Sequence, residues 1–267
     1  IFKKRLCRSG KEGKVEMKIT MLGTGNAAVT KCYNTCFVLE ENGNYFLVDG
    51  GGGNGLFTQL MRAGLDWKRM NEIFVTHKHL DHIMGIVWML RMFSQAMKRG
   101  EYDGEAIIYG HEEVLSILEN MAQMLLPQKQ ARLIGDKIHL IEVKDKEERE
   151  ILGRQMRFFD IGSTKAKQYG FCMKLDGGEK LTCCGDEPYR ECEREYAEGS
   201  KWLLHEAFCL ASQAERFKPY EKHHSTVADA CRMAQQLEVQ NLVLYHTEDA
   251  NIDRRKELYC AEGKPLF

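Results

Sequence analysis

The residues best suited to chemistry lie in the segment THKHLDH, directly after the apolar run IFV. It carries His77, His79 and His82 with Asp81, so three of the chain's nine histidines fall within six positions. His77 and His79 alternate at the end of an extended segment, so both imidazoles can point the same way. Asp81 and His82 follow where the chain turns into a helix. Neutral imidazole with carboxylate suits zinc, and with more oxygen ligands also manganese or iron. The segment therefore predicts a metal site.

This HxHxDH pattern resembles the first motif of the metallo-β-lactamase-fold hydrolases, and the likeness extends over most of residues 17–250. The segments MLGTGNA and FLVDGGGG are similar to the family's opening strands and turns. CCGDEP places Asp186 at the position of the family's metal-bridging aspartate, and LVLYHTED places His246 at that of its last histidine ligand. The resemblance implies an α/β fold, a four-layer αβ/βα sandwich of two facing mixed β-sheets flanked by helices. It also implies two metal ions at one edge.

Two further segments resemble the ribonuclease Z branch, whose members are phosphodiesterases. LLHEAF and HHSTVADA match its HEA and HST motifs. The resemblance implies that His224, supported by Glu206, protonates the leaving oxygen, while Asp81 orients the attacking hydroxide. Cleaving a phosphodiester leaves an alkoxide, and an acid of near-neutral pKa can supply its proton. Alone, each segment also fits a helix cap or a buried strand carboxylate, but their order between Asp186 and His246 favours function.

One ligand that the family needs is absent. Relatives carry a histidine just after a strand, where this chain reads FFDIGSTKAKQYGF and has Gly162. The resemblance then leaves the first metal with His77, His79 and Asp186, and the second with Asp81, His82, Asp186 and His246. A four-ligand zinc site contributes on the order of 10–16 kcal/mol of apparent binding. Losing one imidazole therefore predicts that the first of the two zinc sites is weak.

The substrate is expected to be a small phosphodiester or nucleotide rather than tRNA. The tRNA-processing enzymes of the branch carry a long glycine- and proline-rich arm between the missing histidine and the bridging aspartate. Residues 163–185 here suffice for a two-stranded hairpin, and the formal net charge of −1 provides no global basic field. Ser163, Lys165 and Lys167 are candidates for contacting the substrate. A homodimer is compatible with the sequence.

Two other functions stay open at this point. A carboxylic or thioester hydrolase of the lactonase, glyoxalase or β-lactamase type shares HxHxDH but has no need of HEA and HST. A metal-binding member with little catalytic activity is favoured by Gly162. The loop VDGGGGNG lacks the Gly-Lys-Ser/Thr ending of a phosphate-binding loop, so it is predicted to be a tight turn in which Asp49 shapes the backbone beneath the metals.

Length and composition indicate one large domain in a reducing cytoplasm. Residues 17–267 are predicted to form that domain, and the basic residues 1–16 to form a poorly ordered extension. The ten cysteines include no CxxC pair, and the sequence contains no secretory segment or membrane span.

Periodicity predicts the elements that position these residues. Strands are expected at residues 18–22, 35–40, 45–49, 72–76, 106–110, 137–143, 157–161, 170–175, 180–184, 202–207 and 241–246. Helices are expected near residues 56–62, 81–98, 111–125, 225–237 and 252–259. The charged run KDKEERE (residues 144–150) is predicted to be a solvated turn. His111 is expected to cap a helix, and His139 and His223 are not expected to bind metal.

Overall fold

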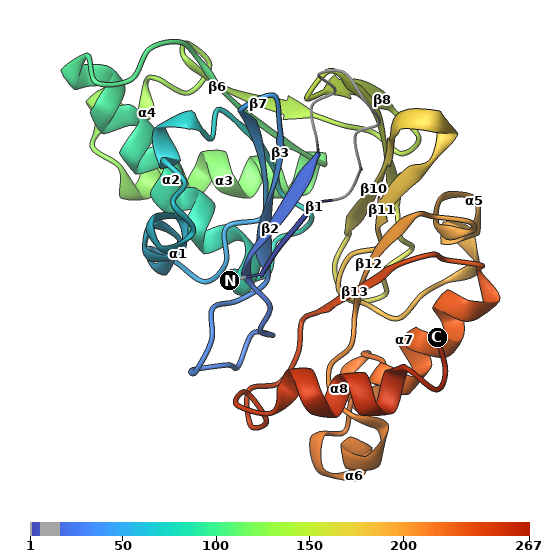
Figure 1. Cartoon of the computed structure of the whole chain (residues 1–267). Helices are drawn as coiled ribbons and strands as arrows, with labels where there is room; N and C mark the ends of the chain where they lie inside the picture. Colours follow the sequence, from blue (N-terminus) through green and yellow to red (C-terminus); the bar gives the residue numbers. More distant parts are fainter. Residues whose placement is uncertain (1, 6–16) are drawn as a thin grey trace. The chain divides into compact units, whose positions relative to one another are not determined.

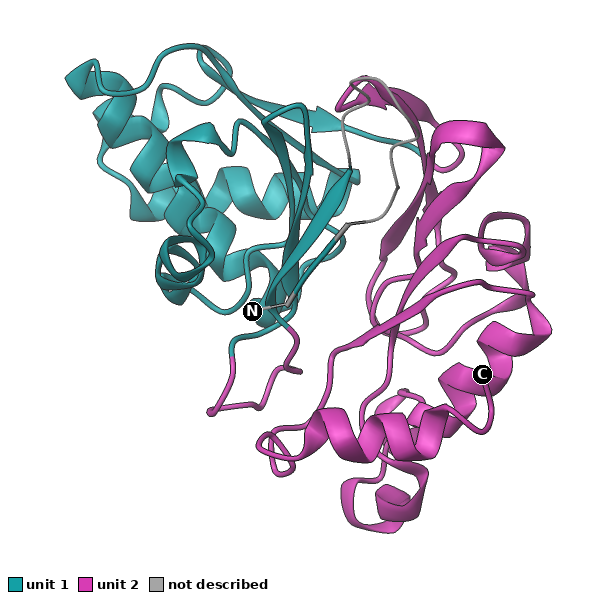
Figure 2. Ribbon diagram, viewed as in Figure 1, with its two compact units in different colours: residues 1–23, 33–144 teal, residues 24–32, 145–267 magenta. Residues whose placement is uncertain are grey.

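The computed structural model describes residues 2–5 and 17–267, which fall into two compact units (Figures 1 and 2). Unit 1 holds the described residues up to Gly23 together with residues 33–144, and unit 2 holds residues 24–32 and 145–267. Each unit is built on one mixed β-sheet with its own helices. The predicted single domain over 17–267 stays a prediction, and the two units are described separately.

Unit 1 contains a seven-stranded sheet whose strands follow one another in chain order. The strands are β1 (Phe2–Arg5), β2 (Lys18–Gly23), β3 (Cys36–Glu41), β4 (Asn44–Val48), β5 (Glu72–Phe74), β6 (Ala106–Gly110) and β7 (Ile138–Glu142). Neighbours from β1 to β4 are antiparallel, and those from β4 to β7 are parallel. Its helices are α1 (Gly55–Ala63), α2 (Leu80–Arg99), α3 (Glu112–Leu125) and α4 (Gln128–Ala131), with a 3₁₀ turn at Trp67–Arg69. Figure 1 shows these helices gathered on one side of the sheet.

Helix α2 is fixed against this sheet by an apolar stripe. Ile83, Ile86, Leu90 and Phe93 recur at helical spacing and belong to the core cluster that also contains alternate residues of β3 and β4. The helix ends at Gly100, whose left-handed backbone (φ 67°) closes the last turn. The packing of α2 therefore determines where its first turn lies, just beyond the end of β5.

Unit 2 contains a six-stranded sheet in the order β13-β12-β11-β10-β9-β8. The strands are β8 (Glu148–Ile151), β9 (Arg154–Asp160), β10 (Tyr169–Lys174), β11 (Lys180–Cys183), β12 (Trp202–Glu206) and β13 (Leu242–Tyr245). The helices are α5 (Arg194–Ala197), α6 (Ala214–Phe217), α7 (Val227–Gln236) and α8 (Arg255–Gly263), and 3₁₀ turns lie at Asp176–Gly178, Glu191–Glu193, Ala211–Gln213 and Tyr220–Lys222. Because β11, β12 and β13 are parallel, their carboxyl ends meet at one edge of the sheet.

The start of α7 is fixed by its cap. The Thr226 hydroxyl accepts a hydrogen bond from the Asp229 amide, while the Asp229 carboxylate accepts one from the Thr226 amide. This reciprocal capping box satisfies two amide groups that the first helical turn would otherwise leave without a partner. It also fixes the HST segment that directly precedes the helix.

Two expectations differ from the structure. The predicted turn over residues 144–150 is wrong in its second half, because β8 begins at Glu148 and pairs with β9. This edge strand carries charged residues, and Glu148 forms an ion pair with Arg157 across the strand pair, so it shows no apolar alternation. The sequence also does not predict β1, within the expected extension. The rest of that extension, residues 1 and 6–16, lies outside the described residues.

The three histidines that were not expected to bind metal lie at a helix start, in a strand and at the end of a 3₁₀ turn. His111 is the N-cap residue of α3, although its side chain accepts no capping hydrogen bond from the first turn. His139 lies in β7, and its Nε2 is 3.2 Å from a Glu105 carboxylate oxygen. His223 ends a 3₁₀ turn in a left-handed conformation.

No disulfide joins the nine cysteines that the structure describes. Within residues 2–5 and 17–267, no helix combines the length and the apolar character that crossing a membrane requires.

Candidate active site

The THKHLDH segment lies in unit 1 where β5 gives way to α2. His79 is the N-cap residue of α2, and its carbonyl oxygen accepts hydrogen bonds from the amides of His82 and Ile83, both at 3.0 Å. His77 therefore lies in the extended segment, whereas Asp81 and His82 lie in the first helical turn. The side chains of His77, Asp81 and His82 are buried. The strand-to-helix junction that the sequence predicts is confirmed.

The nitrogen atoms of these side chains converge. His77 Nε2 lies 2.9 Å from His79 Nδ1, and the His77 and His82 ring centroids are 4.1 Å apart. His82 Nε2 lies 3.5 Å from an Asp81 carboxylate oxygen. Imidazole nitrogens and a carboxylate that converge in this way are atoms of the kind that hold divalent metal ions in proteins. This part of unit 1 thus has the donor set of a divalent metal site.

Asp49, which follows β4, holds the predicted ligand His82 from behind. Its carboxylate accepts hydrogen bonds from the amide and the hydroxyl of Thr76, both at 2.8 Å. The same carboxylate lies 2.7 Å from His82 Nδ1. Because an ionised carboxylate only accepts, His82 Nδ1 is the donor in this contact, which leaves Nε2 as the nitrogen available to a metal ion. A carboxylate behind a histidine in this way orients the ring and raises its basicity. Asp49 was predicted to shape the loop, and the structure shows that it also contacts the His82 ring.

The Gly50 loop and the first turn of α2 approach each other closely. The Gly50 amide donates to the His82 carbonyl oxygen at 2.8 Å, and the Gly85 amide donates to the Gly51 carbonyl oxygen at 2.9 Å. A Cβ atom on Gly85 would lie 1.9 Å from the Gly50 carbonyl oxygen. Gly85 therefore lets the turn that carries Asp81 and His82 lie against the loop that carries Asp49. In the sequence, the only sign of this close approach is a glycine inside an apolar helical segment.

Gly85→Ala is expected to destabilise the protein by about 1–3 kcal/mol, because the new methyl group would push α2 away from the Gly50 loop. In an unconstrained helix the same change would stabilise by about 1 kcal/mol, so the sign of the effect is the test. Urea unfolding of both proteins measures it. A more stable Gly85→Ala variant would contradict the close approach.

Asp186 and His246 lie together in unit 2, just beyond the ends of β11 and β13. His246 Nε2 is 3.3 Å from an Asp186 carboxylate oxygen. The other Asp186 oxygen accepts a hydrogen bond at 2.7 Å from the side-chain amide of Gln168, a residue that sequence reasoning did not single out. His246 adopts a left-handed backbone (φ 56°), and the preceding Tyr245 donates its hydroxyl hydrogen bond to the Gly185 carbonyl oxygen. These contacts fix both side chains at the carboxyl edge of the sheet.

Glu206 and His224 form a buried pair in the same unit. Glu206 ends β12 and is fully buried. One of its carboxylate oxygens accepts hydrogen bonds from the amide and the hydroxyl of Ser225, both at 2.6 Å. The other oxygen faces His224 Nδ1 at 3.6 Å. The His224 ring lies 4.9 Å from that of His246, centroid to centroid. The arrangement has the parts of a histidine acid supported by a carboxylate.

The remaining predicted site residues have local partners in unit 2. Ser163 donates its hydroxyl hydrogen bond to a Glu187 carboxylate oxygen at 2.6 Å, and Lys165 donates its ammonium hydrogen bond to the Lys222 carbonyl oxygen. The Lys167 ammonium lies 5.3 Å from the centroid of the Tyr169 ring. Contact of Ser163, Lys165 and Lys167 with a substrate therefore stays a prediction.

Gly162 occupies a turn between β9 and β10. Its backbone is left-handed (φ 70°), and its amide donates to the Asp160 carboxylate at 2.8 Å. A Cβ atom there would lie 3.3 Å from the Cys192 sulfur and 3.6 Å from Arg190 Cδ. A side chain is therefore accommodated with a small shift of Cys192, at the cost of a backbone conformation that favours glycine.

Glu193 is a second fully buried carboxyl group in unit 2. It accepts a hydrogen bond from the Arg190 amide at 2.8 Å. Burial raises the pKa of Glu193 to about 8. Sequence reasoning could not identify this residue, because the surrounding segment YRECEREYAEG looks uniformly charged and exposed.

The protein is expected to lose stability as pH rises from 6 to 8, with a contribution of about 1.4 kcal/mol per pH unit from Glu193. The unfolded carboxyl group releases its proton near 4.5, whereas the folded one keeps it until about 8, so the stability contributed at low pH is lost through that window. Glu193→Gln is expected to flatten the dependence, as measured by urea unfolding at both pH values. Glu191→Gln, at an exposed neighbour, is the matched control, and an equal slope for all three proteins would contradict the assignment.

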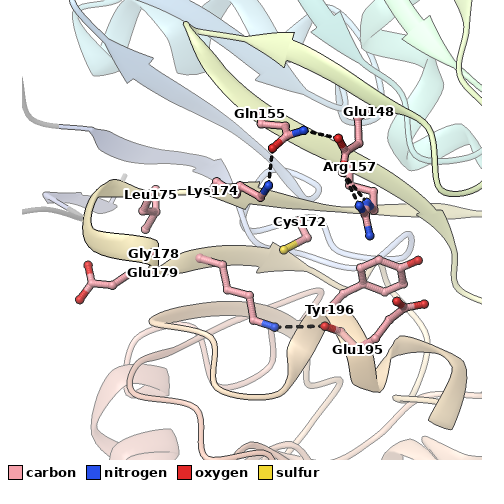
Figure 3. Close-up of a pocket in the computed structure, with 11 residues that line it drawn as sticks. Glu148, Gln155, Arg157, Cys172, Lys174, Leu175, Gly178, Glu179, Glu195 and Tyr196 are labelled. Carbon is pink, nitrogen blue, oxygen red and sulfur yellow. Dashed lines mark hydrogen bonds and ion pairs between the residues drawn. The ribbon is translucent and has the colours of Figure 1, made fainter.

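A cavity of about 480 Å³ lies elsewhere on unit 2, over β8–β11 beside α5 (Figure 3). Its lining contains equal numbers of acidic and basic side chains. Figure 3 shows Gln155 between Lys174 and Glu148, and Glu148 paired with Arg157. Lys180 donates to the Glu195 carbonyl oxygen at 3.1 Å. No predicted site residue lines this cavity, and its charges balance, so it is not the candidate active site.

Comparison with known proteins supports the predicted resemblance. The ribonuclease Z of Nitrosopumilus maritimus (strain SCM1) is 27% identical over 86% of this chain and 89% of its own length. Among solved structures, the metallo-β-lactamase fold protein YhfI from Bacillus subtilis has a TM-score of 0.70 at 17% identity, covering 94% of this chain and 92% of its own. Human tRNase Z, short form, has a TM-score of 0.67 at 23% identity, covering 88% of this chain and 93% of its own.

These likenesses confirm the predicted metallo-β-lactamase fold and the similarity to ribonuclease Z. The sequence also matches a family described as "Anti-Pycsar protein Apyc1" over residues 17–259, which includes every predicted ligand and the Glu206–His224 pair. The chain therefore belongs to the Anti-Pycsar protein Apyc1 family.

Proposed function

We propose that the chain is a metal-dependent phosphodiesterase that hydrolyses a small phosphodiester or nucleotide. The observation that carries this proposal is the buried Glu206–His224 pair, whose facing atoms are 3.6 Å apart in the unit that also carries Asp186 and His246. A phosphodiester with an alkoxide leaving group needs such an acid. Hydrolysis of a lactone, thioester or β-lactam in this fold has no comparable need of it. The ribonuclease Z relatives support the same reaction class.

Two sets of ligands would hold the metal ions. As the family resemblance assigns them, Asp81, His82, Asp186 and His246 would hold one ion, and His77, His79 and Asp186 would hold the other. Zinc suits this mixture of imidazole and carboxylate, and manganese or iron suit it too. A divalent ion bound there lowers the pKa of water and neutralises negative charge that develops on the phosphate.

The protein's own side chains supply the remaining steps. Asp81 orients the attacking oxygen through its carboxylate. His224 gives a proton to the leaving oxygen, and Glu206 stabilises the imidazolium form that has to exist before the transfer. Ser225 holds Glu206 through its amide and its hydroxyl, so the carboxylate keeps one oxygen directed at His224.

The short connection between Gly162 and Asp186 supports a small substrate. The structure describes all of residues 163–185, and they contain the hairpin of β10 and β11 joined by a short turn at Asp176–Gly178. A hairpin of this length offers no long arm for gripping tRNA. The predicted two-stranded hairpin is confirmed. It is the reason for proposing a small phosphodiester rather than tRNA as the substrate.

A substrate panel tests the proposal. It contains an activated phosphodiester, a 3′,5′-cyclic mononucleotide, a precursor tRNA, a lactone, a glutathione thioester and a chromogenic β-lactam. We expect turnover of the first two, with the zinc-loaded protein assayed at neutral pH. Turnover confined to the last three substrates would refute the proposal in favour of a carboxylic or thioester hydrolase.

Gly162→His is expected to raise the affinity of the chain for its second zinc ion, because it returns an imidazole to the weaker site. It is also expected to raise phosphodiester turnover by more than 10-fold. Zinc titration and kcat/KM measure the two effects. Gly162→Ala is the matched control, since it imposes the same left-handed strain of roughly 1–2 kcal/mol without a ligand.

Wild-type protein that already holds two zinc ions per chain with equal affinity would contradict the weak-site interpretation. So would a Gly162→His variant indistinguishable from Gly162→Ala. In either case the site functions with the glycine, and another group would complete the first metal's coordination.

A further inference from the structure

A stacked phenylalanine lies against the proposed acid. Phe208 follows the HEA motif directly, and its ring lies 5.0 Å from the His224 ring, centroid to centroid, with only 11° between the two planes. The side chain is buried. This is a near-parallel stack of an aromatic ring on the imidazole that the proposed function uses.

The backbone of Phe208 is fixed on both sides. Its amide donates to the Ser225 carbonyl oxygen at 2.9 Å, and its carbonyl oxygen accepts from the Glu248 amide at 2.8 Å. The Lys222 ammonium lies 4.9 Å from the centroid of the Phe208 ring, a cation–π contact. The stacking surface therefore does not move independently of the HST segment.

The contact with Glu206 does not fix the imidazole by itself. His224 Nδ1 and the Glu206 carboxylate oxygen are 3.6 Å apart, beyond the range of a good hydrogen bond. Rotation about the last torsion of a histidine has a broad energy profile, so the ring needs a further constraint to keep one nitrogen toward a carboxylate. Phe208 supplies a flat surface parallel to the ring, and rotation out of that plane would break the stack.

From this geometry we infer that Phe208 is a positioning residue for His224. The stack keeps the imidazole in its plane, and the Glu206 carboxylate favours the orientation with Nδ1 toward it. Together they present the other ring nitrogen, Nε2, for proton donation to the leaving oxygen. This inference rests on the proposed function, because it assigns a role within the same proton transfer. It concerns a residue outside the HEA and HST motifs themselves.

The test compares two phosphodiesters with different leaving groups in the zinc-loaded protein. Methyl p-nitrophenyl phosphate releases a weakly basic nitrophenolate that needs no proton, whereas a dinucleoside phosphate releases an alkoxide that does. Phe208→Leu keeps apolar bulk but removes the flat surface. We expect it to slow the dinucleoside phosphate by roughly 10-fold, the size of a lost aromatic stack, and the nitrophenyl ester by less than about 2-fold.

Two further variants separate positioning from a merely structural role. Phe208→Tyr retains the stack and is expected to restore the wild-type ratio of the two kcat values. In a His224→Ala background, Phe208→Leu is expected to have no additional effect, because the acid that it positions is gone.

An equal loss on both substrates, no loss on either, or additivity with His224→Ala would overturn the role of Phe208 while leaving the phosphodiesterase proposal intact. Wild-type protein that turns over neither diester would instead refute the proposed function, and the inference with it. The two failures are therefore distinguishable in one set of assays.

Discussion

Replacing His82 with alanine is expected to reduce phosphodiester turnover by more than 100-fold and to lower the metal content of the purified protein. His82 is buried, its Nδ1 is held 2.7 Å from Asp49, and its Nε2 is directed to the side where Asp81 lies. Loss of a partner behind a metal ligand costs roughly 10- to 100-fold, so loss of the ligand itself should cost more. Steady-state kinetics and elemental analysis of the same preparation measure the two effects.

His139→Ala is the matched control for this prediction. His139 belongs to the same unit, lies in β7 and pairs with Glu105 rather than with any predicted ligand. It should retain both metal and turnover. A His82→Ala protein with wild-type metal content and turnover would show that His82 is not a ligand.

Glu206→Gln is expected to slow hydrolysis of phosphodiesters with alkoxide leaving groups by roughly 100- to 10,000-fold, the usual contribution of general acid catalysis. Glutamine can still accept the hydrogen bonds of Ser225, so the fold around the residue is retained. It no longer carries the negative charge that stabilises a protonated His224. Diesters with a nitrophenolate leaving group should be affected much less, and the ratio of the two rates measures the effect.

His223→Asn controls for changes in the adjacent loop. His223 precedes His224 in the chain and has a left-handed backbone, which asparagine tolerates. This variant should show the wild-type rate on both leaving groups. If Glu206→Gln slowed the hydrolysis of both kinds of diester equally, Glu206 would have a structural role and would not support His224 as an acid.

The spacing of residues in the sequence predicted the part of the site that neighbouring residues form. His77, His79, Asp81 and His82 are neighbours in the chain, so the strand-to-helix junction alone brings them together. Asp186 and His246 are far apart in the chain, and only the family resemblance assigned them. The parallel pairing of β11, β12 and β13 explains why their ends meet at one edge.

Contacts between distant segments could not be predicted. The close approach of Gly85 to Gly50 depends on how α2 packs on its sheet, and no local pattern encodes that distance. The stack of Phe208 on His224 and the burial of Glu193 likewise follow from tertiary packing. Strand β8 was missed because its charged residues have no buried face that would give a period of two.

If the chain hydrolyses phosphodiesters with bound metal, removing the metal must abolish turnover. The purified protein is stripped with a chelator, dialysed, and assayed on a 3′,5′-cyclic mononucleotide before and after addition of zinc or manganese. Turnover is expected to fall to the background rate on metal removal and to recover with added metal, in proportion to the metal regained. Turnover that persists undiminished in protein shown to be metal-free would contradict it.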